Sequence, residues 1–393
     1  MLAVQRRHGY AYFMKDILWI DDDKTLATFC TEAAKHAMLA VDTEFHRERT
    51  YYAQLALVQL GSHGVLACVD PLAKLNLSPL FDLLTDENVL KLVHAGRQDV
   101  EIFFQLMNKT VTPIFDTQVA AALCGYGEQV AYGVLVERLC KVRLEKSHGR
   151  TDWMRRPLDK AVVEYAVDDV HYLPEMVERL TETLQSKGRR DWLDEEQTLL
   201  TDEKKLVVDV DQVWKKLKGA GKLRGVSCAI AQHVAAWREK RAMHKDLPKR
   251  RILSDEVVVD LARQKPKGMA ELDRMRGLED GLKRRYGKEL LKLVSEAEAF
   301  DEANWPAPKE GKPRLVDDAQ VAALQAVLEI QAREHGISPQ ILASKNDLQK
   351  LCSGERDVSV VQGWRHELAG EVVLGFLAGE RSLTCSGKKL VLK

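Results

Sequence analysis

Two carboxylates stand at the end of one of the most apolar stretches of the chain. Residues 39–45 read LAVDTEF, so three apolar residues lead into Asp42, and Glu44 follows two positions later. Residues i and i+2 of a β-strand face the same side, which would place the two carboxylates next to each other. They would repel each other unless a cation lay between them. The pattern indicates a cation site, although a strand end that turns into solvent would also carry two acids.

A second acid follows another apolar segment. In HAGRQDVEIF (94–103) a buried-looking strand ends near Gly96, and Asp99 lies in the first turn of the next helix. The helix dipole alone is enough to explain an acid at that position. We interpret His94 as a structural residue at the strand end rather than as a ligand.

A third segment, EYAVDDVHYL (164–173), pairs a phenol with a carboxylate. Tyr165 and Asp169 are four residues apart and therefore share one face of a helix, where they could orient a water molecule. Asp168 competes with Asp169 for this role. The alternative is a surface acid beside a partly buried tyrosine.

Together the three segments offer four carboxylates, Asp42, Glu44, Asp99 and Asp169, without a matching cluster of His or Cys. A set of oxygen ligands suits Mg²⁺ or Mn²⁺ rather than zinc. Two such ions about 4 Å apart stabilise the attacking and leaving oxygens in phosphodiester hydrolysis. The sequence therefore predicts two divalent cations per active site.

The elements that must position these residues follow from hydrophobic patterning. Apolar runs predict strands, and apolar periodicity near 3.6 predicts helices. The predicted strands are 17–20, 39–45, 55–61, 65–70 and 89–96, and the predicted helices are 21–37, 77–85, 97–107 and 115–127. This order predicts an α/β domain with a mixed sheet flanked by helices.

From about residue 200 the strand signals disappear and short helices follow. The stretch NWPAPKEGKP (304–313) indicates a linker. After it, Asp317 and Gln320 resemble a capping box, and Gly336 is positioned to end that helix. We expect these segments: a disordered extension (1–13), the α/β domain (14–200), a first helical domain (218–300), a linker (301–316) and a second helical domain (317–393).

Composition argues against a disulfide-stabilised, zinc-binding, membrane-spanning or secreted protein. The chain has 393 residues and no net charge, and its seven scattered cysteines lack zinc-site spacing, so we expect them to be reduced. No apolar run approaches the ~20 residues of a membrane helix, and the first thirteen residues do not form a secretory signal. We expect a cytoplasmic protein.

Two basic segments point to nucleic acid. Residues 215–251 contain twelve Lys and Arg against two acids, a local charge of +10, which is typical of phosphate binding, although a solvated helix face is the alternative. Nearer the acids, Trp153 could stack on a base or pack in the core, with equal support for each. The candidate nucleic-acid-binding residues are Lys146, Arg150, Trp153, Arg238, Arg241, Lys245, Lys249 and Arg250.

In combination, the D-x-E strand, the HAGRQD segment and the Y-x-x-x-D helix resemble the DEDDy 3′→5′ exonucleases. VDTEFHRERTYYAQLALVQLG, GRTDWMRRPL and YAVDDVHYLP occur in the order and style of the ribonuclease D family, over about residues 14–393. The resemblance implies a ribonuclease H-like exonuclease domain followed by two all-α HRDC bundles. The first bundle fits the HRDC pattern well, and the second is less typical.

The resemblance also implies roles for individual residues. Asp42 would contact both cations, Glu44 and Asp169 would complete the site of the cation that activates water, and Asp99 would help to hold the other. Tyr165 would position the attacking water, since its pKa near 10 makes it a poor base. The Y-x-x-x-D register selects Asp169 over Asp168. His94 stands where related enzymes often carry Asn.

The implied activity is removal of 5′-mononucleotides from the 3′ ends of structured RNA such as tRNA precursors. A DNA-directed 3′→5′ exonuclease and a catalytically inactive RNA-binding protein are the alternatives, and the preference for RNA rests on the resemblance alone. GAGKLRG (219–225) lacks the first Gly and the Ser/Thr of a P-loop, and GYGEQV (125–130) lacks the third Gly of a dinucleotide fingerprint. No nucleotide cofactor is expected.

Overall fold

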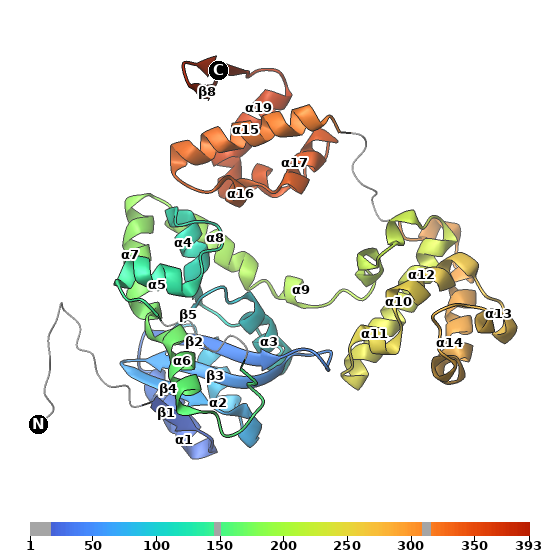
Figure 1. Ribbon diagram of the computed structural model, residues 1–393, viewed down its shortest axis with the longest axis horizontal. Coiled ribbons are helices and arrows are strands. Elements are labelled where there is room, and N and C mark those ends of the chain that lie inside the picture. Colours follow the sequence, from blue (N-terminus) through green and yellow to red (C-terminus); the bar gives the residue numbers. More distant parts are fainter. Residues whose placement is uncertain (1–16, 145–150, 309–315) are drawn as a thin grey trace, which may run out of the picture.

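The structure is a computed structural model that describes residues 17–144, 151–308 and 316–393. It consists of one α/β domain and two separate helical units (Figure 1). The predicted extension 1–13 and residues 309–315 of the predicted linker lie outside the described residues. None of the helices in the described part of the chain combines the length and the apolar composition that a bilayer crossing requires.

The α/β domain is built on a mixed sheet of six strands in the order β1-β4-β3-β2-β5-β6. The strands are β1 (Ile17–Ile20), β2 (Met38–His46), β3 (Gln54–Ser62), β4 (Val65–Val69), β5 (Leu90–Val93) and β6 (Ile114–Asp116). β3 runs antiparallel to both β2 and β4, whereas the β1–β4, β2–β5 and β5–β6 pairs are parallel. The predicted mixed sheet is confirmed.

Helices cover both faces of this sheet. They are α1 (Asp23–Ala33), α2 (Ser78–Thr85), α3 (Arg97–Met107), α4 (Thr117–Cys124), α5 (Tyr132–Cys140), α6 (Lys160–His171), α7 (Leu173–Ser186) and α8 (Arg190–Leu200). Alternation along β2 shows the two layers, because Leu39 and Val41 pack with α1, α2 and α3, while Ala40 packs with α4 to α7. Asp42 and Glu44 lie on the same face of β2 as Ala40.

Two expectations about secondary structure were wrong. Residues 115–127 are not one helix, because Asp116 ends β6 and its side chain then accepts hydrogen bonds from Gln118 N and Val119 N to cap α4. Strands also return near the C-terminus as a hairpin of β7 (Leu383–Ser386) and β8 (Lys389–Leu392). Each of these strands has only three or four residues, too short for a clear periodic signal.

The first helical unit (residues 213–305) has its own apolar core. It contains α10 (Val226–Lys245), α11 (Lys249–Ile252), α12 (Asp255–Gln264), α13 (Met269–Asp273) and α14 (Asp280–Ala299), and α9 (Glu203–Leu206) lies in the connection from the α/β domain. The two long helices, α10 and α14, pack against each other around the buried side chains of Tyr286 and Leu290.

The second helical unit (residues 316–393) contains α15 (Asp318–His335), α16 (Pro339–Leu342), α17 (Lys345–Cys352), α18 (Gly363–Arg365) and α19 (Glu371–Leu377). Asp317 caps α15 by accepting from Ala319 N, so the predicted box with Gln320 does not form. Gly336 ends the helix in the left-handed region, as expected. That both helical units are HRDC domains stays a prediction.

The second helical unit docks on the α/β domain next to α4 and α8. Trp192 and Trp364 stack with ring centroids 4.6 Å apart, and Arg365 donates to Glu196 at 2.5 Å. Gly125 completes this contact, because its φ is +95° and an added Cβ would lie 2.3 Å from the carbonyl oxygen of Gly336. The interface therefore needs glycine at position 125.

We predict that Gly125→Ala destabilises this interface more than Gly336→Ala does. Both substitutions place Ala in the left-handed region, at a cost of about 1–2 kcal/mol, but the added Cβ at 336 meets open space. The clash at 125 should add about 1–3 kcal/mol. Denaturant unfolding measures the difference, and equal losses for the two variants would contradict the close approach.

Candidate active site

Three carboxylates meet where β2 passes beneath α6. Asp42 and Glu44 lie on β2, Asp169 lies on α6, and one oxygen from each side chain lies within 4.8 Å of those of the other two. α6 packs against β2, β3 and β4, which brings a residue from more than 120 positions away onto the sheet. The same-side placement of Asp42 and Glu44 follows from the period of the strand.

Asp99 joins this cluster by a different contact. It lies in the first turn of α3, is 7% exposed, and accepts a short hydrogen bond from the hydroxyl of Thr43, between the two acids of β2. Its charge raises the pKa values of Asp42 and Glu44, so it lies close to them. Asp99 is not, however, in the group whose oxygens converge within 4.8 Å.

Burial and mutual repulsion make these carboxyl groups weak acids. Burial, followed by the charges of Asp99 and Asp169, raises the pKa of Asp42 well above its usual range and that of Glu44 to about 8. Burial likewise raises the pKa of Asp169 to about 7 and that of Asp99 to about 6. A divalent cation among these oxygens would reverse both effects, so the donor set fits such an ion.

Tyr165 lies one turn before Asp169 on α6 and is partly buried. Burial, together with the charge of Asp169, raises its pKa above the ordinary value for tyrosine. The phenol therefore stays protonated at neutral pH and is suited to donating or accepting a hydrogen bond, not to removing a proton.

Two residues near these acids gave no sequence signal. The hydroxyl of Tyr132 donates to the carbonyl of Asp168 at 2.7 Å and accepts from Tyr172 N, and these bonds hold the end of α6. Gln59 lies opposite Asp42 in the β2–β3 register, is fully buried, and has no side-chain hydrogen bond among the described residues. Both are placed by the tertiary fold, which spacing along the chain does not reveal.

His94 has the structural role that the sequence indicated. Its Nδ1 lies 2.9 Å from the hydroxyl of Thr117, and its Nε2 lies 3.0 Å from the carbonyl oxygen of Val130. The next two backbone amides, of Ala95 and Gly96, donate to Asp116 at the end of β6. These contacts fix the turn that leads into α3 and hence the position of Asp99.

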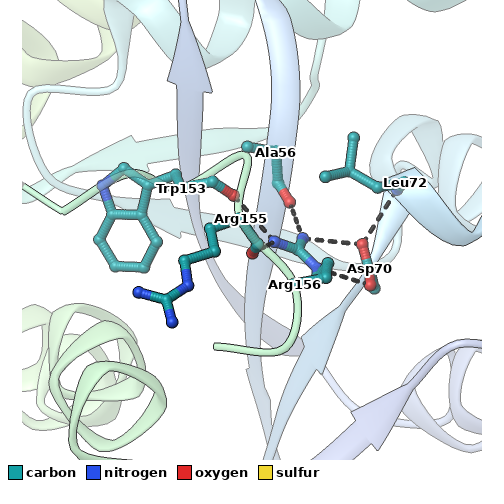
Figure 2. Close-up of polar contacts among 6 residues, drawn as sticks. All are labelled: Ala56, Asp70, Leu72, Trp153, Arg155 and Arg156. Atoms are coloured by element: carbon teal, nitrogen blue, oxygen red, sulfur yellow. Dashed lines mark hydrogen bonds and ion pairs between the residues drawn. The ribbon is translucent and has the colours of Figure 1, made fainter. Parts of the chain in front are cut away.

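Arg156 fixes the loop that leads into α6 (Figure 2). Its guanidinium donates two hydrogen bonds of 2.7 Å to Asp70 at the end of β4 and one of 2.5 Å to the carbonyl of Ala56 on β3. It also donates to the carbonyl groups of Trp153 and Arg155, both at 2.8 Å. The planar guanidinium of Arg156 thus connects the loop, through hydrogen bonds, to the sheet that carries the acids.

The candidate nucleic-acid residues differ in how they are placed. The ring of Trp153 is partly buried against the core, in line with core packing, and Lys146 and Arg150 lie outside the described residues. Arg238 was wrongly predicted as a surface contact, because it is 3% exposed and donates to Asp255 at 2.7 Å. Helical periodicity turns it into the core of the first helical unit.

The other basic residues of that unit remain at the surface, some with partners. Arg241 donates twice to Glu289 at 2.7 Å, Lys245 donates to the Tyr286 hydroxyl at 3.0 Å, and Lys249 lies 3.3 Å from Glu239. Arg250 is exposed and has no ion pair among the described residues. Of the twelve cations in the charge run, Arg238, Arg241 and Lys249 form ion pairs among the described residues.

Comparison with known proteins identifies the family. A model of the 3′-5′ exonuclease family matches residues 17–185, and one of the HRDC domain matches residues 228–294. Ribonuclease D of Jannaschia sp. is 41% identical over 93% of this chain and 96% of its own length, and that of Sphingobium indicum is 37% identical over 94% and 97%. The chain belongs to the ribonuclease D family.

A solved structure agrees with this assignment. The crystal structure of Escherichia coli RNase D, described as an exoribonuclease involved in structured RNA processing, is 32% identical to this chain with a TM-score of 0.83. The match covers 93% of this chain and 99% of that one. This ribonuclease D homologue is a 3′→5′ exoribonuclease that depends on divalent metal and acts on RNA.

We predict that Arg156→Lys lowers both stability and kcat, because one ammonium group cannot replace five guanidinium donors. Loss of these bonds should cost about 1–3 kcal/mol in unfolding free energy. Arg155→Lys is the matched control, since the Arg155 side chain points away from this network in Figure 2. Equal effects in the two variants, measured by denaturant unfolding and turnover, would contradict the role of Arg156.

We predict that added Mn²⁺ raises Tm more at about pH 8 than at about pH 6. The pKa values of Asp99, Asp169 and Glu44, about 6 to 8, exceed the ordinary carboxyl value near 4. The metal-free fold therefore loses stability as the pH rises from about 4 to about 8. A cation removes that loss and competes with protons only at the lower pH. Differential scanning calorimetry with Na⁺ at matched ionic strength as control tests this, and a pH-independent shift would contradict it.

Proposed function

We propose that this ribonuclease D homologue removes 5′-mononucleotides from RNA 3′ ends with two divalent cations, Mg²⁺ or Mn²⁺, at Asp42, Glu44, Asp99 and Asp169. The observation that carries the proposal is the convergence of oxygens from three partly buried carboxylates within 4.8 Å. Such a cluster is stable as anions only with cations present. All its donors are oxygens, the ligands that Mg²⁺ and Mn²⁺ prefer.

In this proposal each residue has one task. Asp42 would help to hold both cations, Glu44 and Asp169 would hold the ion that serves the attacking water, and Asp99 would help to hold the other. When bound, the cations would supply Lewis-acid activation and offset the charge that develops on the phosphate. Tyr165 orients the water by hydrogen bonding, in keeping with a pKa that is raised and not lowered. Asp168 takes no part, because it has the wrong register on α6.

The proposed substrates are structured RNAs such as tRNA precursors, and the proposed location is the cytoplasm. Support comes from the relatives named ribonuclease D and from the E. coli enzyme described as acting in structured RNA processing. All seven cysteines are free, in keeping with a reducing compartment. Proposed RNA contacts outside the acidic cluster are Lys146, Arg150, Trp153, Arg241, Lys245, Lys249 and Arg250.

We predict that Asp42→Asn lowers kcat by about 10³-fold or more, since a cation contact is worth several kcal/mol. The fold should survive or gain stability, because the substitution removes one member of a repelling cluster. Asp168→Asn is the matched control and should retain most activity.

Turnover is measured on a 5′-labelled RNA with Mg²⁺ or Mn²⁺, and the mononucleotides are identified by mass spectrometry. Wild-type activity that persists in excess chelator would contradict the proposal. So would an Asp42→Asn variant that is folded and as active as the Asp168→Asn control.

A further inference from the structure

A groove of about 870 Å³ lies between the α/β domain and the HRDC domain in the first helical unit. One wall is the β2–β3 loop (residues 47–53) together with the C-terminal end of α3, and the other is formed by α10, α11 and the short turn Val213–Lys216. Figure 1 shows the β2–β3 hairpin reaching towards α11. The groove is of a size that holds ligands in other proteins.

The two walls are held together by three specific hydrogen bonds. The backbone amides of Tyr51 and Tyr52 both donate to Asp246 Oδ1 at 3.0 Å, at the C-terminal end of α10. The hydroxyl of Tyr51 donates to Oε1 of Glu239 at 2.6 Å, and Glu239 is 1% exposed. The groove is therefore a defined part of the structure, not an accidental gap between domains.

The lining combines exposed apolar side chains with unpaired cations. Four of the exposed large hydrophobic residues in the described part of the chain lie here, namely Tyr52 (36%), Leu106 (47%), Val207 (59%) and Val208 (41%). Lys216 and Arg250 are exposed and form no ion pair among the described residues. The two acids in the lining are already matched, Glu239 by Lys249 and Asp255 by Arg238.

This groove begins close to the acidic cluster. Arg47 lines it and is three residues beyond Glu44 along the chain, a span of at most about 10 Å. Gln105 also lines it and is six residues beyond Asp99 on α3, a rise of about 9 Å. At about 3.4 Å per stacked nucleotide, roughly three nucleotides reach from the carboxylates to the groove.

We propose that this groove holds the single-stranded RNA that lies on the 5′ side of the nucleotides at the acidic cluster. Lys216 and Arg250 would contact phosphates, and the exposed ring of Tyr52 would stack on a base. The free cations favour a polyanion over a protein partner with an apolar surface. The proposal rests on the proposed function, because it takes the acidic cluster as the place where the 3′ end is cleaved.

The direct test compares two double variants with the same loss of charge. Lys216→Gln with Arg250→Gln removes the free cations of the groove, whereas Lys218→Gln with Arg251→Gln removes exposed neighbours that lie outside its lining. The value of kcat/KM is measured on single-stranded RNAs from dinucleotides to chains of about ten nucleotides, at several salt concentrations. Full-length protein is used throughout.

The groove variant should lose roughly tenfold in kcat/KM on the long RNAs and nothing on dinucleotides. Its slope of log(kcat/KM) against log[salt] on long RNA should be shallower by about 1.4, at about 0.7 per lost phosphate contact. The control variant should match wild type in both measures. Dinucleotide turnover by wild type reports on the acidic cluster itself, so a failure of the proposed function would be visible separately.

Three outcomes would overturn the proposal. Unchanged kinetics of the groove variant on every RNA would show that RNA does not use the groove and would leave it to a protein partner. Equal losses on dinucleotides and long RNAs would assign Lys216 and Arg250 to the cleavage site. Equal losses in the groove and control variants would show only a general effect of net charge.

Discussion

The cost of keeping four carboxylates close together and away from water is the constraint on which the rest of the structure depends. Burial raises the pKa values of Asp42, Glu44, Asp99 and Asp169, and the charges of Asp99 and Asp169 raise those of Asp42 and Glu44 further. Such a cluster lowers the stability of the metal-free fold at neutral pH. Its position is therefore maintained by contacts elsewhere, and a bound divalent cation would offset the repulsion.

Those contacts are distributed over the fold. β2 supplies two acids and is held between β3 and β5 in the centre of the sheet. α6 supplies the third, and it is fixed at its start by the Arg156 network and at its end by the Tyr132 hydroxyl. The β2–β3 loop then bonds to the HRDC domain through Tyr51, so the strand that carries Asp42 and Glu44 also carries the contact between domains.

The sequence predicted the mixed sheet and the carboxylates, because strand and helix periods decide which acids share a face. Asp42 with Glu44, and Tyr165 with Asp169, are local pairs of this kind. Arg238 was placed wrongly because a dense run of charge hides which face of α10 is buried. Gln59, Tyr132 and the three-residue β6 gave no signal, since their partners are set only by the tertiary fold.

The central claim is that these carboxylates bind divalent cations, and anomalous diffraction from crystals soaked in Mn²⁺ tests it most directly. The account predicts two anomalous peaks, each marking a Mn²⁺ ion held by oxygens from the set Asp42, Glu44, Asp99 and Asp169. Saturating Mn²⁺ with no peak at these side chains, in crystals of protein that is active in solution, would contradict it.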